Sequence, residues 1–189
     1  MKKREPHTGG TQYCAFLRGI NVGGNKLIAM EALRKALEAL GLKNVRTVLA
    51  SGNVAFEGPE AEPATLARKI EKRIEAAFRT PTHVMLRKAV QLRDLAASNP
   101  FGEVTVTTGM KLYLTLLPGP TKFRLKTPYQ SPKGEFRILK VRDTHVFWLV
   151  DPSEGGNTLD CMSFLEEEFG KEITTRNWNT ILRLLDLPG

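Results

Sequence analysis

The chain has 189 residues, of which 41% are hydrophobic and 25% charged, as in ordinary globular proteins. Its two cysteines, Cys14 and Cys161, stand in apolar stretches without the paired spacing of zinc or redox sites, so we expect no disulfide, metal or cofactor. No apolar stretch is long enough to cross a bilayer, and the charged start lacks the hydrophobic block of a signal peptide. We therefore expect a cytoplasmic protein that does not enter the membrane.

The formal net charge of +8 is unevenly distributed along the chain. Residues 121–142 carry seven basic side chains and one acidic one, whereas residues 151–172 carry seven acidic side chains and one basic one. Such a layout can attract a polyanion to one side of the protein. Solvated strand faces and loops produce similar clusters without any ligand, and this second interpretation is the commoner outcome.

The first part of the chain, after a flexible tail over residues 1–12, is expected to form a ferredoxin-like subdomain over residues 13–88. Its expected elements are a strand (13–17), a glycine-rich loop (18–26), a helix (28–40), a hairpin of two strands (45–49 and 53–56), a helix that Pro63 opens, and a strand (83–87). This order of strand, helix, strand, strand, helix, strand is the split βαβ arrangement.

A linking helix over residues 89–98 is expected to lead to a second ferredoxin-like subdomain over residues 99–189. There the pattern partly repeats, with a strand (110–117), a long basic loop (118–134), a hairpin (135–150), a helix (158–169) and a final helix that starts near Thr174. We predict an α+β fold of two similar subdomains, consistent with an internal duplication.

Residues 17–58 (LRGINVGGNKLIAMEALRKALEALGLKNVRTVLASGNVAFEG), NPF at 99–101 and TTRNWNTILRLLDL at 174–187 resemble the signature stretches of the bacterial family called domain of unknown function 1697. The resemblance implies two ferredoxin-like subdomains and brings no established activity. Relatives carry a segment like GRSKL after the hairpin, where this chain has Asn157, Thr158 and Asp160 in place of the basic and serine positions. If residues 151–163 hold an anion in relatives, this protein holds it more weakly or not at all.

The loop between the first strand and the first helix is a candidate anion site. Backbone N–H groups and the helix dipole converge at such loops, and the candidate residues here are Arg18, Asn21, Gly23, Gly24 and Lys26. The spacing fits neither a Walker A loop nor a dinucleotide fingerprint. The alternative is that the glycines permit a tight turn while the asparagines satisfy backbone groups.

A second candidate lies at the expected start of the last helix, where Arg176 and Asn177 follow two threonines. A positive charge in the first turn is opposed by the helix macrodipole, so Arg176 is expected to have a negative partner. The partner is either a bound anion or a carboxylate such as Glu172. The hairpin turn at Ser51 is expected at the opposite end of the sheet from Arg18, so the two need not meet.

The basic loop offers a weaker hypothesis of nucleic-acid binding through Lys122, Arg124, Lys126 and Tyr129. Cations mixed with aromatic rings, here also Phe123 and Phe136, are what single-strand binders use to follow phosphates and stack bases. The alternative is a solvated loop.

No catalytic motif is recognisable, and the three histidines stand without neighbouring metal ligands at the usual spacing. We therefore leave open whether the protein is an enzyme. The leading hypothesis is a binding module for a phosphate-bearing ligand, either a nucleic acid or a nucleotide-like metabolite. The alternatives are an enzyme acting on a phosphorylated small molecule and a protein-protein interaction module that associates through exposed sheet edges. The oligomeric state is left open.

Overall fold

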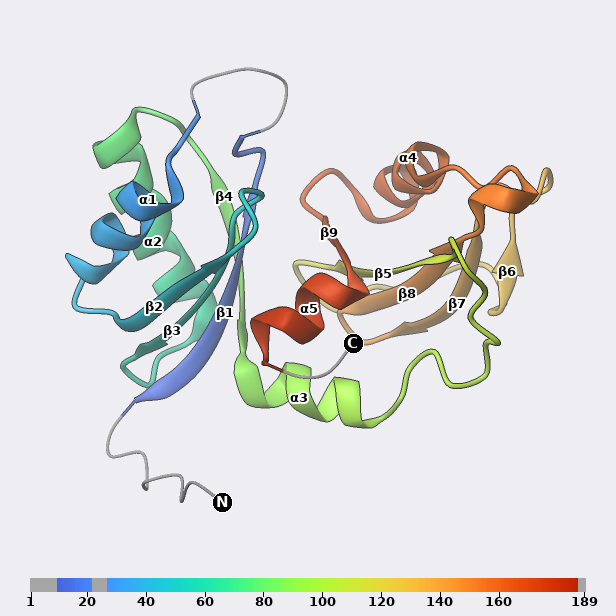
Figure 1. Cartoon of the computed structure of the whole chain (residues 1–189), viewed down its shortest axis with the longest axis horizontal. Coiled ribbons are helices and arrows are strands. Elements are labelled where there is room, and N and C mark those ends of the chain that lie inside the picture. Colours follow the sequence, from blue (N-terminus) through green and yellow to red (C-terminus); the bar gives the residue numbers. More distant parts are fainter. Residues whose placement is uncertain (1–9, 22–26, 187–189) are drawn as a thin grey trace. The chain divides into compact units, whose positions relative to one another are not determined.

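The protein is described by a computed structural model that covers residues 10–21 and 27–186 (Figure 1). The chain divides into two compact units, Met1–Leu92 and Arg93–Gly189. The boundary falls inside α3 (Ala89–Ala97), the helix expected to link the subdomains. Each unit contains one antiparallel sheet, so the α+β class predicted from the sequence is confirmed.

The first unit has the predicted order of strand, helix, strand, strand, helix, strand before α3. Its elements are β1 (Thr11–Arg18), α1 (Met30–Glu38), β2 (Lys43–Val48), β3 (Asn53–Gly58), α2 (Pro63–Phe78) and β4 (His83–Lys88). The 4-stranded sheet has the order β2-β3-β1-β4, with all neighbours antiparallel. Strand β2 lies at an edge, and its register with β3 shifts between Lys43 and Arg46.

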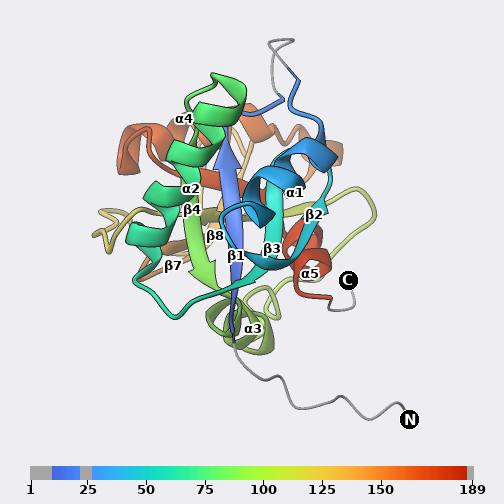
Figure 2. The same ribbon diagram turned by 90° about the vertical axis from the view of Figure 1, so that its left-hand side faces the viewer.

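Helices α1 and α2 cover the same face of this sheet, as Figures 1 and 2 show. Alternate residues of a strand point to one face, so Tyr13, Ala15 and Leu17 of β1 all enter one core cluster. Leu66 and Ile70 of α2 join that cluster from the apolar stripe of the helix. The helical and strand periodicities in the sequence therefore converge on a single core for this unit.

The second unit contains more strands than the first in the part that the structure describes. Its elements are β5 (Lys111–Leu116), β6 (Tyr129–Gln130), β7 (Arg137–Arg142), β8 (His145–Val150), a short 3-10 helix η1 (Pro152–Glu154), α4 (Thr158–Phe169), β9 (Thr174–Asn177) and α5 (Trp178–Leu184). The 5-stranded sheet has the order β6-β7-β8-β5-β9, with all neighbours antiparallel.

The expectation that the last helix begins near Thr174 is wrong. Thr174–Asn177 is strand β9, which pairs with β5 from Thr174 opposite Leu116 to Asn177 opposite Tyr113. The β-branched threonines suit a strand, and β5 offers them a free edge, so tertiary pairing decides the conformation of this short segment.

The two sheets share one strand order. In the second unit β7-β8-β5-β9 repeats the relation β2-β3-β1-β4 of the first, and α4 follows β8 as α2 follows β3. The repeat is partial, because residues 117–136 contain β6 and no helix where the first unit has α1.

Trp148 forms the centre of the core of the second unit. Its indole is fully buried and stacks on Tyr113 with ring centroids 4.3 Å apart. The indole Nε1 donates a 2.8 Å hydrogen bond to Thr115 Oγ1, which lies 2.7 Å from Thr175 Oγ1. The buried polar atoms thus satisfy one another across β8, β5 and β9.

In the described part of the chain, no helix is both long and apolar enough to span a bilayer.

Candidate functional site

Asn21 fixes the loop that follows β1. Its side-chain nitrogen donates hydrogen bonds to the carbonyls of Ile28 (3.0 Å) and Ala50 (2.9 Å), and its side-chain oxygen accepts one from Ile28 N (2.7 Å). Gly19 and Asn21 both have positive φ, at 71° and 57°, which glycine and asparagine tolerate best. The side chain therefore ties the two ends of the loop to the hairpin turn between β2 and β3.

The expectation that this loop and the hairpin turn lie at opposite ends of the sheet is wrong. Strand β1 runs antiparallel to β3, with Phe16 opposite Asn53, so the end of β1 lies beside the start of β3. Leu17 N donates a 2.8 Å hydrogen bond to Gly52 O. Asn53 is completely buried and binds Val48 O and Ser51 Oγ from the same turn, each at 3.0 Å.

These contacts limit what the loop can offer an anion. A primary amide has two N–H donors, and both of those of Asn21 are directed at carbonyls. Arg18 is half-buried at the end of β1. The structure does not describe Gly23, Gly24 and Lys26. It therefore shows only the residues on either side of them in the predicted anion site.

Arg176 and Asn177 have different surroundings from those expected. Arg176 lies in β9, outside the first turn of α5, so the argument from the helix macrodipole does not apply to it. Its Nη1 donates a 2.7 Å hydrogen bond to Thr175 O, and burial lowers its pKa to about 10. Asn177 caps α5, because its Oδ1 accepts a 3.0 Å hydrogen bond from Asn179 N.

The aromatic residues of the basic segment pack internally. Tyr129 stacks on Phe164 of α4 with ring centroids 5.4 Å apart, and Phe123 stacks on Phe169 at 5.6 Å. Both rings pack against the core cluster of the second unit. The neighbouring cations Lys122, Arg124 and Lys126 are exposed. The structure therefore assigns these rings a packing role, which leaves the cations without stacking platforms at Phe123 and Tyr129.

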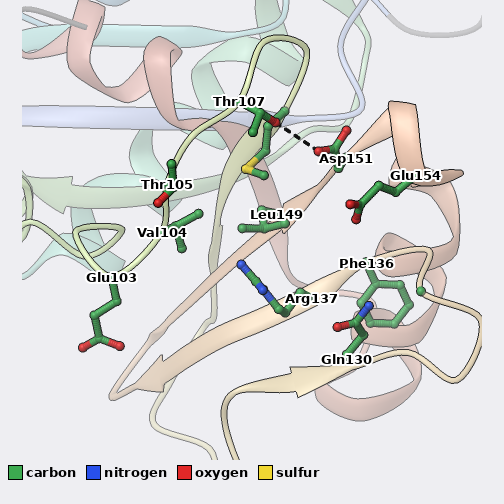
Figure 3. Close-up of a pocket in the computed structure, with 12 residues that line it drawn as sticks. Glu103, Val104, Thr105, Thr107, Gln130, Phe136, Arg137, Leu149, Asp151 and Glu154 are labelled. Carbon is green, nitrogen blue, oxygen red and sulfur yellow. Dashed lines mark hydrogen bonds between the residues drawn. The ribbon is translucent and has the colours of Figure 1, made fainter.

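A cavity of about 380 Å³ opens in the second unit, at the end of the sheet where β8 ends and β7 begins (Figure 3). It is lined by side chains from three stretches of the chain, residues 103–110, 130–137 and 149–154. The residues that matter most for its chemistry are Glu103, Thr107, Arg137, Leu149, Asp151 and Glu154.

Arg137 supplies the positive charge of the cavity. It lies on the same sheet face as Leu149, its partner in β8, whereas the next residue, Ile138, faces the core. Its Nε atom is buried and has no hydrogen-bond partner among the described residues. A buried guanidinium nitrogen without a partner costs free energy, since it has lost water and gained nothing.

Asp151 is held rigidly at the opposite side. Its carboxylate accepts hydrogen bonds from Ser153 N (3.0 Å), from Ser153 Oγ and from Thr107 Oγ1 (3.1 Å). The hydrogen bond from Ser153 Oγ is the main reason that the pKa of Asp151 lies below its usual value, so the carboxylate stays ionised at neutral pH. Gly156 N closes the turn with a 2.8 Å hydrogen bond to Asp151 O.

Sequence reasoning did not identify this cavity. Arg137 belongs to the basic segment 121–142 and Asp151 to the acidic segment 151–172, and the sequence marks neither as a candidate site residue. The run Asp-Pro-Ser-Glu-Gly-Gly predicts a tight turn with a capping aspartate. Nothing in residues 103–110 marks them as the opposite wall. No group of three or more histidine, cysteine, aspartate or glutamate side chains in residues 10–21 and 27–186 could hold a metal ion.

Comparison with known proteins gives a family and a fold. No curated protein matches the chain. A solved structure, "conserved bacterial protein SP0830" from Streptococcus pneumoniae, is 19% identical and has a TM-score of 0.65, with 94% of this chain and 98% of that chain covered. At this identity the likeness shows the shared fold alone. Residues 11–147 match the family described as "Protein of unknown function (DUF1697)", and the chain therefore belongs to that family.

Proposed function

We propose that the protein binds a small ligand carrying a phosphate group, and that Arg137 holds this group in the cavity of the second unit. The observation that carries the proposal is the buried Nε of Arg137, which has no hydrogen-bond partner among the described residues. Guanidinium groups bind phosphate oxygens through paired N–H donors, and a bound phosphate would satisfy the orphaned nitrogen.

The size of the cavity favours a metabolite over a nucleic acid. Its volume of about 380 Å³ falls in the range of small-molecule pockets. A nucleic-acid strand needs an extended basic groove with free aromatic faces, and the rings of Phe123 and Tyr129 are already stacked on Phe169 and Phe164. A role for the loop after β1 stays a prediction for Arg18 and for the residues beyond Asn21.

We infer further that both units are ferredoxin-like and derive from a duplication. The shared relation of β2-β3-β1-β4 to β7-β8-β5-β9 supports this inference, as does the position of α2 after β3 and of α4 after β8.

Binding of ribose 5-phosphate and inorganic phosphate, measured by isothermal titration calorimetry, tests the proposal. We expect Arg137→Gln to weaken phosphate binding about 10- to 100-fold, the usual cost of removing a charge-assisted hydrogen-bonding partner. The matched control is Arg142→Gln, at the other end of the same strand and exposed. Equal effects of the two variants, or no binding by the unmodified protein, would refute the proposal.

A further inference from the structure

We propose that the ligand also carries a cationic amino group, recognised by Asp151 and Glu154, so that the cavity selects amino-bearing phosphate monoesters. The inference rests on the phosphate site proposed at Arg137 and names the class of ligand that the rest of the cavity fits. It is carried by the distribution of charge around the cavity, where carboxylates outnumber the guanidinium of Arg137.

Three carboxylates, Glu103, Asp151 and Glu154, line the cavity together with the single guanidinium of Arg137. A simple phosphate entering such a site would gain attraction from Arg137 and meet repulsion from the carboxylates. A ligand with a positive group at a short distance from its phosphate converts that repulsion into attraction. Discrimination then comes from both the favourable pairing and the penalty on the wrong ligand.

The carboxylates approach the cavity from a different element than Arg137. Glu154 ends η1 and Asp151 precedes it, whereas Arg137 begins β7. In Figure 3, Asp151 and Glu154 lie to one side of Arg137 and Glu103 lies to the other. A ligand with unlike charges at its two ends can pair its phosphate with Arg137 and its amino group with Asp151 and Glu154.

Asp151 retains acceptor capacity for such a group. Its Oδ1 receives both hydrogen bonds from Ser153, while Oδ2 receives the one from Thr107. A carboxylate oxygen accepts about two hydrogen bonds, so Oδ2 can receive a further N–H donor. The N–H groups of an organic ammonium are donors of the kind that Oδ2 can still accept.

The test compares phosphoethanolamine with ethyl phosphate, which differ by the amino group, by calorimetric titration at low and physiological salt. We expect the unmodified protein to prefer phosphoethanolamine by about two- to fivefold, the range of an exposed ion pair. Glu154→Gln should remove most of this preference and leave ethyl phosphate binding equal or tighter. Glu167→Gln, on an exposed position of α4, is the matched control and should change neither affinity.

The outcomes separate the two proposals. Equal affinity for both compounds, with no effect of Glu154→Gln or Asp151→Asn on their ratio, would overturn the amino-group inference and leave the phosphate site standing. If neither compound binds, both the phosphate site and the amino-group inference are overturned. Both proposals are supported by a pair of results. Arg137→Gln should lose affinity for phosphoethanolamine and for ethyl phosphate, and only the carboxylate variants should lose the preference for phosphoethanolamine. Thermal unfolding of each variant checks that it remains folded.

Discussion

Asn21 and Ala50 are joined by a 2.9 Å hydrogen bond from the side-chain amide of the first to the carbonyl of the second. The bond closes one end of the first sheet by fastening the loop after β1 to the turn between β2 and β3. Residues 19–21 (GIN) and 51–53 (SGN) therefore lie at the same end of the sheet, although α1 and β2 separate them in the chain.

Replacing Asn21 should destabilise the first unit. Asn21→Ala removes three hydrogen bonds to the backbone. It also places alanine, which adopts a positive φ less readily than asparagine, at φ 57°. We expect a loss of about 2–4 kcal/mol in the free energy of unfolding, measured by urea titration. Asn21→Gly relieves the backbone strain and should be milder by about 1 kcal/mol. Equal stability of both variants and the unmodified protein would show that the Asn21 hydrogen bonds to Ile28 and Ala50 do not stabilise the fold.

Gly52 is expected to be intolerant of any side chain. A Cβ at this position would lie 2.8 Å from Leu17 Cβ and 2.8 Å from Ile20 Cδ1, and its φ is +75°. We expect Gly52→Ala to cost about 2–4 kcal/mol, from overpacking together with backbone strain. The matched control is Gly41→Ala, which has φ +81° and no atom within 4 Å of the added Cβ. The control should cost about 1–2 kcal/mol, and a cost equal to that of Gly52→Ala would show that packing contributes nothing.

Gly156 is expected to control the shape of the cavity. A Cβ there would lie 2.5 Å from Asp151 O and 2.6 Å from Asp151 N, so Gly156→Ala must displace the turn that carries the Asp151 carboxylate. We expect about a tenfold loss of affinity for phosphoethanolamine, because displaced ligand groups lose much of their hydrogen bonding. Gly119→Ala provides the comparison, since its Cβ meets no atom within 4 Å and its φ is not positive. Unchanged affinity in Gly156→Ala would place the ligand elsewhere.

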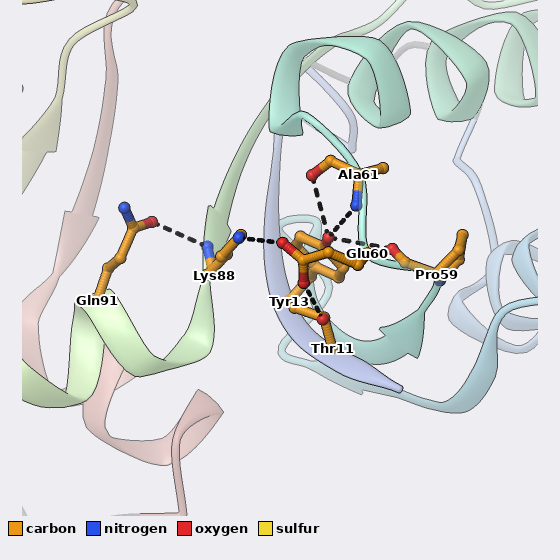
Figure 4. Close-up of polar contacts among 7 residues, drawn as sticks. All are labelled: Thr11, Tyr13, Pro59, Glu60, Ala61, Lys88 and Gln91. Atoms are coloured by element: carbon orange, nitrogen blue, oxygen red, sulfur yellow. Dashed lines mark hydrogen bonds and ion pairs between the residues drawn. The ribbon is translucent and has the colours of Figure 1, made fainter. Parts of the chain in front are cut away.

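The pH dependence of stability should report on Glu60. As Figure 4 shows, the carboxylate of this residue accepts hydrogen bonds from Lys88 and Thr11, beside the Tyr13 hydroxyl that contacts the backbone of Pro59 and Ala61. The hydrogen bond from Lys88 is the main cause that lowers the pKa of Glu60 below about 4.5. Because the folded pKa is depressed, the stabilisation is present above pH 4.5 and is lost as the pH falls through the folded value.

Urea unfolding of Glu60→Gln at pH 7 and pH 3 checks this dependence. The variant should be less stable than the unmodified protein at pH 7, and the difference should shrink at pH 3, where the carboxyl is largely protonated. Glu167→Gln, at an exposed position of α4 in the second unit, is the control. A difference that stays constant between the two pH values would contradict a role for the ionised Glu60.

The fold of the first unit could be predicted because its helices bury stripes at regular spacing and its strands are long enough to show alternation. Strand β9 was missed because a segment from Thr174 to Asn177 is too short to show a period and directly precedes a helix. Its conformation comes from pairing with β5, a partner distant in sequence.

The candidate site was harder to predict than the fold. Residues 103–110 contribute Thr107 and Glu103 through an irregular path that follows no periodicity, and their meeting with Arg137 depends on the sheet register. The glycines of the loop after β1 predict an anion site, whereas the Asn21 side-chain amide donates its hydrogen bonds to the backbone carbonyls of Ile28 and Ala50. The anion site expected at Gly23, Gly24 and Lys26 stays a prediction, because these residues lie outside the described part of the chain.

The shifted register of β2 bears on how copies of this protein behave when crowded. The strand lies at an edge of its sheet, carries Lys43 and Arg46, and has Asn44 in a left-handed conformation at φ 51°. Irregular backbone and positive charge at an edge prevent another chain from continuing the hydrogen-bond ladder. Aggregation by edge-to-edge pairing of this sheet is therefore disfavoured at β2, and concentrated preparations should resist fibril formation through this strand.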